Sequence, residues 1–218
     1  MIFGGKLPDR VRQTVMAVLG LFTLGLGFQL FLKTGNSLVV LAALLVGTIL
    51  GEWWRIEERL ENLGEALKTR FSLLFSKQNH SRFVEGFLTA SLLFSIGPMA
   101  ILGSIQDGLT GDYILLATKA IMDGFAALAF ASTMGAGVIF SAFIVLAFQG
   151  GITLLAIQIQ NLATLAMINE MSAAGGVILV GIALSNILNV VKVRTGSFLP
   201  ALFLAPLFAA LAVFLGLL

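Results

Sequence analysis

Long runs of apolar residues, separated by short polar segments, make up most of this chain. A helix needs about 20 mainly apolar residues to cross a bilayer, and the runs have this length. They lack the strict alternation of polar and apolar positions that marks transmembrane β-strands. The pattern therefore predicts an all-α fold, a polytopic transmembrane bundle of about seven helices at this spacing. We expect a single integral membrane domain over residues 1–218.

Seven apolar stretches are the predicted spans. Their approximate bounds are 14–32, 38–54, 83–105, two spans within 113–166, 173–191 and 198–218. Gly97-Pro98 interrupts the third span, and such pairs bend or end helices. The turn between the fourth and fifth spans is left open, with Gly135-Ala136-Gly137, Ser141 and Gly150-Gly151 as candidates. Glu170 and Ser172 fit the cap of the sixth span, a helix end where charge costs little.

Residues 55–75 differ from the spans because apolar and charged residues share the segment at helical spacing. The apolar stripe consists of Ile56, Leu60, Leu63, Leu67, Phe71 and Leu74. We expect an amphipathic helix on the cytoplasmic side, lying along the membrane surface or packing on a partner copy. A solvated connector helix is the alternative that the pattern leaves open.

Charged residues are rare in the second part of the chain. From residue 83 to residue 218 there are eight: Glu85, Asp107, Asp112, Lys119, Asp123, Glu170, Lys192 and Arg194. With 58% hydrophobic residues and a mean hydropathy of +1.02, this chain requires lipid as its solvent. Each charge inside a bilayer costs free energy, so the few that lie there are candidates for function.

Several classes of activity are excluded by residues that the sequence lacks. It has no cysteine and one histidine, His80, which excludes disulfides, thiol catalysis and metal sites built on paired histidines. It also lacks a phosphate-binding glycine loop ending in Lys-Ser or Lys-Thr. We therefore expect no enzyme activity, no metal site, no cofactor and no nucleic-acid partner.

Basic residues determine the expected orientation. Six of the 13 Lys and Arg residues fall within 55–82, and an excess of basic residues marks the cytoplasmic side. Counting spans from there places the N-terminus in the cytoplasm and Asp107 and Asp112 outside. The first ten residues contain no apolar core, so a cleavable signal peptide is not expected.

Two parts of the sequence resemble each other at a distance of 161 positions. The segment from Gly20 to Lys33-Thr34-Gly35-Asn36 matches the segment from Gly181 to Arg194-Thr195-Gly196-Ser197. In the predicted topology they enter the membrane from opposite sides, as inverted-topology repeats do in secondary transporters. A weaker similarity, at 38 positions, makes Gly97-Pro98 and Gly135-Ala136-Gly137 corresponding helix breaks. Chance similarity between helices rich in Gly and Leu is the alternative.

Several short motifs are specific enough to compare with known families. They are Gly103 to Asp112 (GSIQDGLTGD), followed by Lys119, Asp123 and Phe125; Leu7-Pro8-Asp9-Arg10; Gly51-Glu52; Ser172-Ala173-Ala174-Gly175-Gly176; and Leu199-Pro200-Ala201-Leu202. In these motifs the chain resembles domain of unknown function 554, a family of uncharacterised bacterial inner-membrane proteins. The resemblance implies a multi-pass protein of the bacterial plasma membrane, loosely labelled a sodium channel or pump. It also implies a Gly-rich helix ahead of Leu7, where this sequence has only Met1 to Lys6, either a shortened or a divergent start.

Polar residues inside the predicted spans are the candidates for an ion pathway. Lys119 and Asp123 are four positions apart, so they share a helix face and can neutralise each other in lipid. The other candidates are Asn186, Asn189 and Gln149. For each of them the alternative is a structural ion pair or a hydrogen bond between helices. The predicted breaks that would expose backbone groups to an ion are Gly97, Pro98, Gly135 and Gly137.

An acidic segment precedes Lys119 and Asp123. Its polar members are Gln106, Asp107, Thr110 and Asp112. We expect a flexible outer loop that concentrates cations at an entrance. An ordinary capped turn is the alternative.

Charged and amide groups within a dry bundle, together with broken helices, favour one function. The prediction is a small secondary transporter or channel for an inorganic cation, linked to Na⁺ or H⁺, in the lipid bilayer and as a homo-oligomer. The alternative is a non-transporting assembly or regulatory protein that acts through the helix at 55–75. The sequence does not choose the ion.

Overall fold

The computed structural model describes residues 8–70, 80–160 and 164–216. Every regular element within these ranges is helical, which confirms the all-α prediction. The elements are α1 (Asp9–Phe31), α2 (Ser37–Trp53), α3 (Ile56–Arg70), α5 (His80–Ser95), α6 (Pro98–Thr110), α7 (Ile114–Met134), α8 (Gly137–Leu154), α9 (Ala156–Ile159), α10 (Leu165–Ile182), a π-helical turn (Ala183–Ile187), a 3₁₀ turn (Thr195–Phe198) and α11 (Pro200–Phe214).

Five helical segments of the described chain are long and apolar enough to cross a membrane individually. They are Gln13–Phe31, Ile114–Met134, Gly137–Leu154, Leu165–Ile187 and Thr195–Phe214. Two bent pairs, α2 with α3 at 59° and α5 with α6 at 60°, raise the number to seven if each counts as one span. These five to seven segments overlap the seven predicted spans, with different bounds for the second and the sixth, and the turn left open between 113 and 166 lies at Gly135-Ala136.

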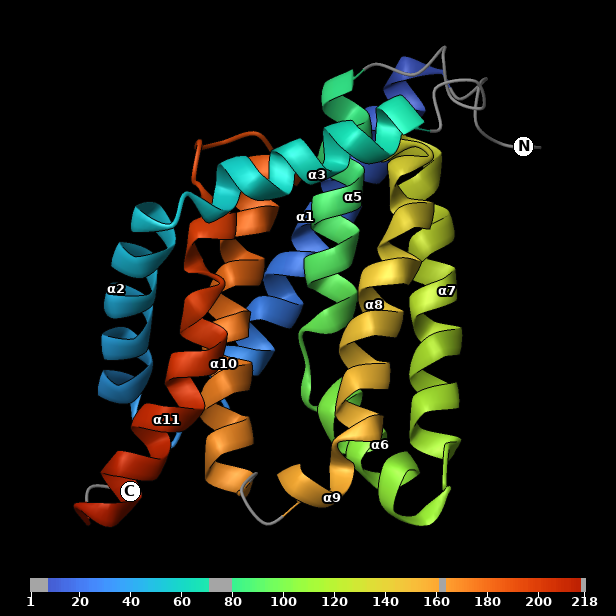
Figure 1. Ribbon diagram of the computed structural model, residues 1–218. Helices are drawn as coiled ribbons and strands as arrows, with labels where there is room; N and C mark the ends of the chain where they lie inside the picture. The colour runs from blue at the N-terminus through green and yellow to red at the C-terminus, as the bar shows by residue number, and fades with distance from the viewer. Residues whose placement is uncertain (1–7, 71–79, 161–163, 217–218) are drawn as a thin grey trace.

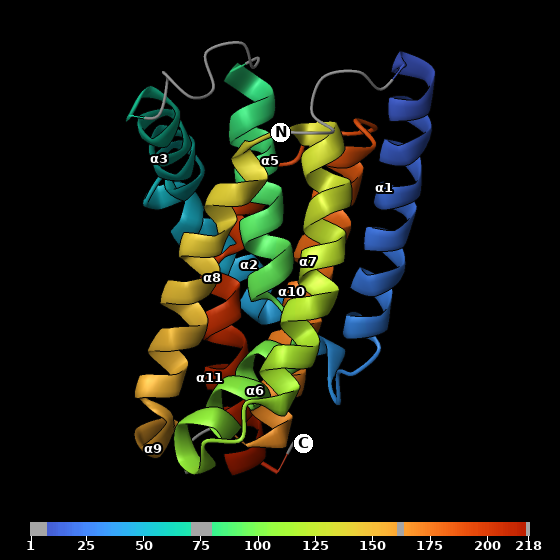
Figure 2. The ribbon, with the colours of Figure 1, turned by 90° about the vertical axis from the view of Figure 1, so that its right-hand side faces the viewer.

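The bundle has two distinct ends (Figure 1). Helix α3 lies across one of them, called here the α3 end, and α9 lies at the other, the α9 end. The link between α1 and α2 is at the α9 end, whereas the segment before α11 is at the α3 end, so these two links lie at opposite ends. Seen from the side, α7 stands between α1 and α8 (Figure 2).

Two packed groups of helices make up the bundle. In one group α1 packs on α10 and α2 packs on α11; in the other α8 packs on both α5 and α6. The contact between α1 and α10 is close enough that a Cβ atom on Gly27 would lie 2.7 Å from the carbonyl oxygen of Gly176. Such backbone contact between small residues is how helices associate in lipid, where hydrophobic burial gives no driving force.

Helix α3 packs against the bundle more closely than its amphipathic pattern predicts. Gly64 is buried against the side chains of Val84 and Phe87 on α5, and Leu60 faces the interior of the bundle. The described helix ends at Arg70, and the last predicted residues, 71–75, lie outside the described part of the chain.

Candidate functional site

Lys119 joins two helices in the interior of the bundle. It lies on α7, it is 8% exposed, and its Nζ donates a hydrogen bond to the backbone carbonyl of Phe94 near the end of α5. The same Nζ pairs with the carboxylate of Asp123, one turn further along α7. The structure thus confirms that Lys119 and Asp123 share a helix face, and it adds Phe94 as a third member of the group.

The break between α5 and α6 explains why the Phe94 carbonyl is available. In a continuous helix this carbonyl would accept from the backbone N–H of residue 98, but Pro98 has none. The α5 ladder ends with the N–H of Ile96 on the carbonyl of Leu92, 3.0 Å away. Gly97 then adopts φ 146° and ψ 149°, a conformation that side chains with a Cβ rarely adopt. The ammonium of Lys119 therefore occupies the place of the missing donor.

Asp123 provides the negative charge that this ammonium needs. A lone charge within a bilayer is costly, and a hydrogen-bonded partner lowers that cost. The Asp123 side chain is 26% exposed, so one face of the pair is more open than the ammonium itself.

A cavity of about 220 Å³ lies beside the break. Its walls come from α5, α8, α10 and α11, and Leu60 of α3 lies over it. The polar side chains that line it are Ser91, Ser95 and Ser172, and Gly97 contributes backbone. Within the described residues, the hydroxyls of Ser91 and Ser95 are buried without a hydrogen-bond partner, whereas Ser172 donates to the carbonyl of Ile168 at 2.6 Å. Two unpartnered hydroxyls are therefore buried in the wall of an apolar cavity at the broken helix.

The other predicted pathway residues do not join this group. Gln149 lies on α8 with a buried amide nitrogen that has no partner among the described residues. Asn186 lies in the π-helical turn that follows α10, and Asn189 is exposed just beyond it with φ 53°. Because that turn is at the α3 end, the two asparagines are separated from the middle of the bundle and are not part of one site with Lys119.

The predicted flexible entrance loop is wrong. Gln106, Asp107 and Thr110 lie inside α6, which ends at Thr110, and Gly111 follows as its left-handed cap. Asp112 accepts from the amide of Gln106 at 2.7 Å and from the backbone N–H of Ile114 at 3.1 Å. The capped-turn alternative is therefore the one observed, because the side chains satisfy the ends of two helices.

The two predicted helix breaks differ in kind. Gly97-Pro98 bends one span, as expected, at 60°. Gly135, with φ 90°, and Ala136 instead form the turn between α7 and α8, and Gly137 begins α8. The expectation that these breaks occupy corresponding places is wrong, since one lies within a span and the other joins two spans.

Glu170 was expected at a helix cap, and this prediction is wrong. It lies in the second turn of α10, which begins at Leu165, and it is 1% exposed. Its carboxylate accepts from Thr34 Oγ1 at 2.6 Å, from the N–H of Gly35 at 2.7 Å and from the N–H of Asn36 at 3.2 Å. These donors precede α2, so the carboxylate is held at a helix N-terminus, where the backbone favours negative charge. We call this group the Glu170 clasp.

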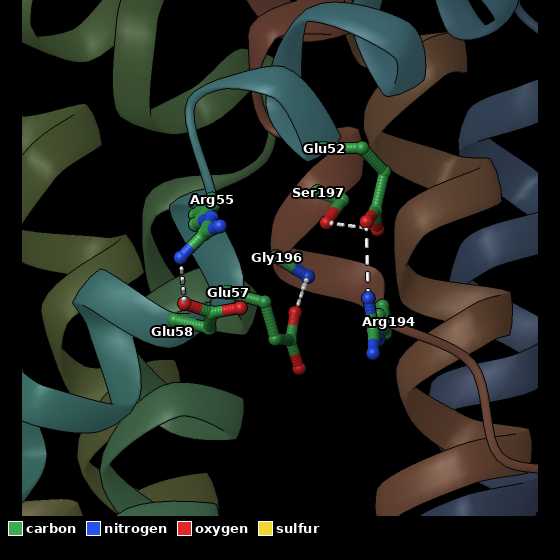
Figure 3. Close-up of polar contacts among 7 residues, drawn as sticks. All are labelled: Glu52, Arg55, Glu57, Glu58, Arg194, Gly196 and Ser197. Atoms are coloured by element: carbon green, nitrogen blue, oxygen red, sulfur yellow. Dashed lines mark hydrogen bonds and ion pairs between the residues drawn. The ribbon is translucent and has the colours of Figure 1, made fainter.

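A second group of carboxylates holds the opposite end of the bundle (Figure 3). Glu52, near the end of α2, accepts from Ser197 Oγ at 2.7 Å and from the Arg194 guanidinium at 3.0 Å. Glu57 on α3 accepts from the N–H of Gly196 at 2.5 Å. These donors precede α11. We call this group the Glu52–Glu57 clasp.

The electrostatic environment of Glu57 follows from its position on α3, the helix that lies across the end of the bundle. Burial raises the pKa of Glu57, and the hydrogen bond from Gly196 opposes this effect. Glu61 and Glu52 add to the increase in pKa, and Arg194 reduces it.

Comparison with known proteins identifies the family. The sequence model of the family described as "Protein of unknown function (DUF554)" matches residues 1–210. The chain belongs to this family. It is 30% identical over 209 residues to "Uncharacterized membrane protein YdfK" of Bacillus subtilis, covering 94% of this chain and 86% of that protein. It is 31% identical over 206 residues to "Uncharacterized protein YqgA" of Escherichia coli, covering 94% and 87%. No solved structure matches.

The family assignment agrees with the resemblance expected from the sequence motifs. The name of the Bacillus subtilis relative describes a membrane protein, which fits the apolar helices seen in this chain. Which end of the bundle faces the cytoplasm stays a prediction from the distribution of basic residues.

Proposed function

We propose that the chain is a small secondary transporter or channel for an inorganic cation, linked to Na⁺ or H⁺. The observation that supports this most is the broken α5–α6 span, where the intramembrane Lys119 binds the Phe94 carbonyl beside the cavity. Discontinuous helices of this kind provide the binding sites of many transporters.

The end of α5 has the chemistry that a cation needs. The last carbonyls of a helix lack intrahelical donors and carry negative partial charge. At this helix end one carbonyl, that of Phe94, already binds a cationic group, the Lys119 ammonium. Ser91 and Ser95 lie on the same helix and are among the residues that line the cavity, and their buried hydroxyls lack partners among the described residues. Carbonyl and hydroxyl oxygens are suitable ligands for Na⁺, so we place the transported ion at this end of the cavity.

The alternative, an assembly or regulatory role through residues 55–75, has less support. One side of α3 is already covered, because Leu60 lines the cavity and Gly64 packs on α5, whereas Leu63 is exposed. A helix reserved for a partner would keep a larger apolar surface exposed than Leu63 alone among the described residues of the stripe.

Ion flux into proteoliposomes tests the proposal. Purified protein is reconstituted, and uptake of Na⁺, K⁺ and H⁺ is compared between the wild type, Asp123→Asn and a Ser91→Ala/Ser95→Ala variant. We expect uptake above protein-free liposomes and a loss of roughly tenfold or more in each variant, since losing a hydrogen bond to a charged group costs about 1.5–3 kcal/mol. Uptake of all three ions at the level of protein-free liposomes would overturn the proposal.

A further inference from the structure

The two clasps use equivalent positions of the internal similarity. Gly35 and Gly196, 161 positions apart, each donate their backbone N–H to a glutamate, at 2.7 and 2.5 Å. Beside each glycine a hydroxyl donates to a carboxylate, Thr34 to Glu170 and Ser197 to Glu52. The two groups lie at opposite ends of the bundle. The equivalence holds for the two glycines; the hydroxyl donors differ, because Thr34 corresponds to Thr195 and Ser197 corresponds to Asn36.

Each clasp links helices by polar contacts at one end of the bundle. Glu170 ties α10 to the start of α2, and Glu52 and Glu57 tie α2 and α3 to the start of α11. Both ends of the group formed by α1, α2, α10 and α11 are therefore fastened in the same structure.

The clasps are also continuous with the cavity walls. Met171 and Ser172, which line the cavity, directly follow Glu170 along α10. Leu60 lies one turn after Glu57 on α3, and Leu199 lies two positions after Ser197. Residues next to both clasps thus line the same cavity.

We propose that the Glu170 clasp and the Glu52–Glu57 clasp are the two gates of this cavity, opening alternately to give access from the α9 end and from the α3 end. The inference rests on the proposed function, since the cavity is where we place the ion. The described state, with both clasps formed, is the closed intermediate between the two open states.

The two gates differ in strength. The Glu170 carboxylate is buried and satisfied by three donors, and breaking such a group leaves a charge without partners. At the other clasp Glu52 and Arg194 have side chains that are 45% and 70% exposed, and exposed ion pairs contribute little. The α3 end therefore opens more readily in the unmodified protein.

Cysteine labelling tests the gates, because the chain contains no cysteine of its own. Met171→Cys reports on the α9 end and Leu60→Cys on the α3 end, each labelled by a membrane-impermeant maleimide applied to one side of proteoliposomes. In the Glu170→Gln background we expect Met171→Cys to label at least about tenfold faster and Leu60→Cys to label more slowly. In a Glu52→Gln background, which weakens the contacts with Ser197 and Arg194, we expect the reverse.

Matched controls are exposed or capping carboxylates at the same two ends, outside both clasps: Asp112→Asn at the α9 end and Glu58→Gln at the α3 end. They should leave both labelling rates unchanged. Faster labelling at both ends together, or no change in the clasp variants, would overturn the inference.

Labelling requires no flux, so the two proposals can fail separately. Reciprocal labelling without ion uptake would support the gates and remove cation transport. Ion uptake without reciprocal labelling would support transport and remove the gates.

Discussion

The ammonium of Lys119 takes the place of the backbone N–H that Pro98 lacks, on the carbonyl of Phe94. A cation from one helix thus completes the broken end of another within the bundle. The carboxylate of Asp123, which is more exposed than the Lys119 side chain, balances the charge of the ammonium. This relationship connects the helix break, the ion pair and the neighbouring cavity, and it allows each to be tested through the others.

Removing the ammonium should destabilise the fold. Lys119→Met leaves the Phe94 carbonyl without its donor and Asp123 without its counter-ion, and removing one partner of a buried pair costs about 3–5 kcal/mol. We expect the low end of this range because Asp123 is partly exposed. Thermal unfolding in detergent measures the change, with the exposed Lys192→Met as a control. If Lys119→Met lost no more thermal stability than Lys192→Met, the ammonium would not be stabilising the end of α5.

Restoring the missing N–H should relieve the dependence on Lys119. In Pro98→Ala residue 98 gains an N–H, and this donor reaches the Phe94 carbonyl once Gly97 takes a helical φ in place of 146°, so the loss caused by Lys119→Met should shrink when the two changes are combined. A double-mutant cycle of unfolding free energies measures this coupling. Additive effects of the two substitutions would show that Lys119 does not replace the missing donor.

The contact between α1 and α10 should tolerate no added side chain. In Gly176→Ala the new Cβ would lie 2.5 Å from the carbonyl oxygen of Gly27, and overpacking of this kind typically costs about 1–3 kcal/mol. Gly25→Ala is the matched control, because no atom lies within 4 Å of its Cβ position and alanine favours helix. The temperature of thermal unfolding should fall for Gly176→Ala and stay level or rise for Gly25→Ala. Equal behaviour of the two variants would argue against this contact.

The contact of α3 with the segment before α11 should strengthen in acid. Burial raises the pKa of Glu57 in the packed state, so this state binds a proton more tightly than the released state. By linkage, packing gains stability as the pH falls through the raised pKa and is weaker above it. Labelling of Leu60→Cys, relative to the exposed Asn62→Cys, should therefore slow toward acid pH, and Glu57→Gln should remove this trend. If labelling of Leu60→Cys relative to Asn62→Cys became faster in acid, the predicted direction of this pH dependence would be wrong.

Local patterns in the sequence predicted most of the helices. Apolar runs predicted the spans, and Gly97-Pro98 predicted the bend, because each feature lies within one continuous segment of the sequence. The prediction of a flexible loop in the acidic segment is wrong because Gln106 and Thr110 continue α6, and the αL conformation of Gly111 ends that helix. Glycine and aspartate near a helix end are equally compatible with a loop.

The clasps could not be predicted from local pattern. Glu170 is buried by donors 134 to 136 positions away, and no local feature distinguishes it from a capping carboxylate. The signal that pointed toward them was the similarity at 161 positions, which marked both donor segments without identifying their acceptors. Likewise, Ser91 and Ser95 became candidates only when the cavity placed them at the break.

Cation transport at the α5 break can be measured as the initial rate of Na⁺ uptake into proteoliposomes. We expect uptake well above protein-free liposomes for the wild type and for the control Glu58→Gln, whose carboxylate faces solvent beside Arg55. We expect a loss of roughly tenfold or more for Asp123→Asn. Wild-type uptake no greater than that of protein-free liposomes, for Na⁺ and equally for K⁺ and H⁺, would contradict cation transport at this break.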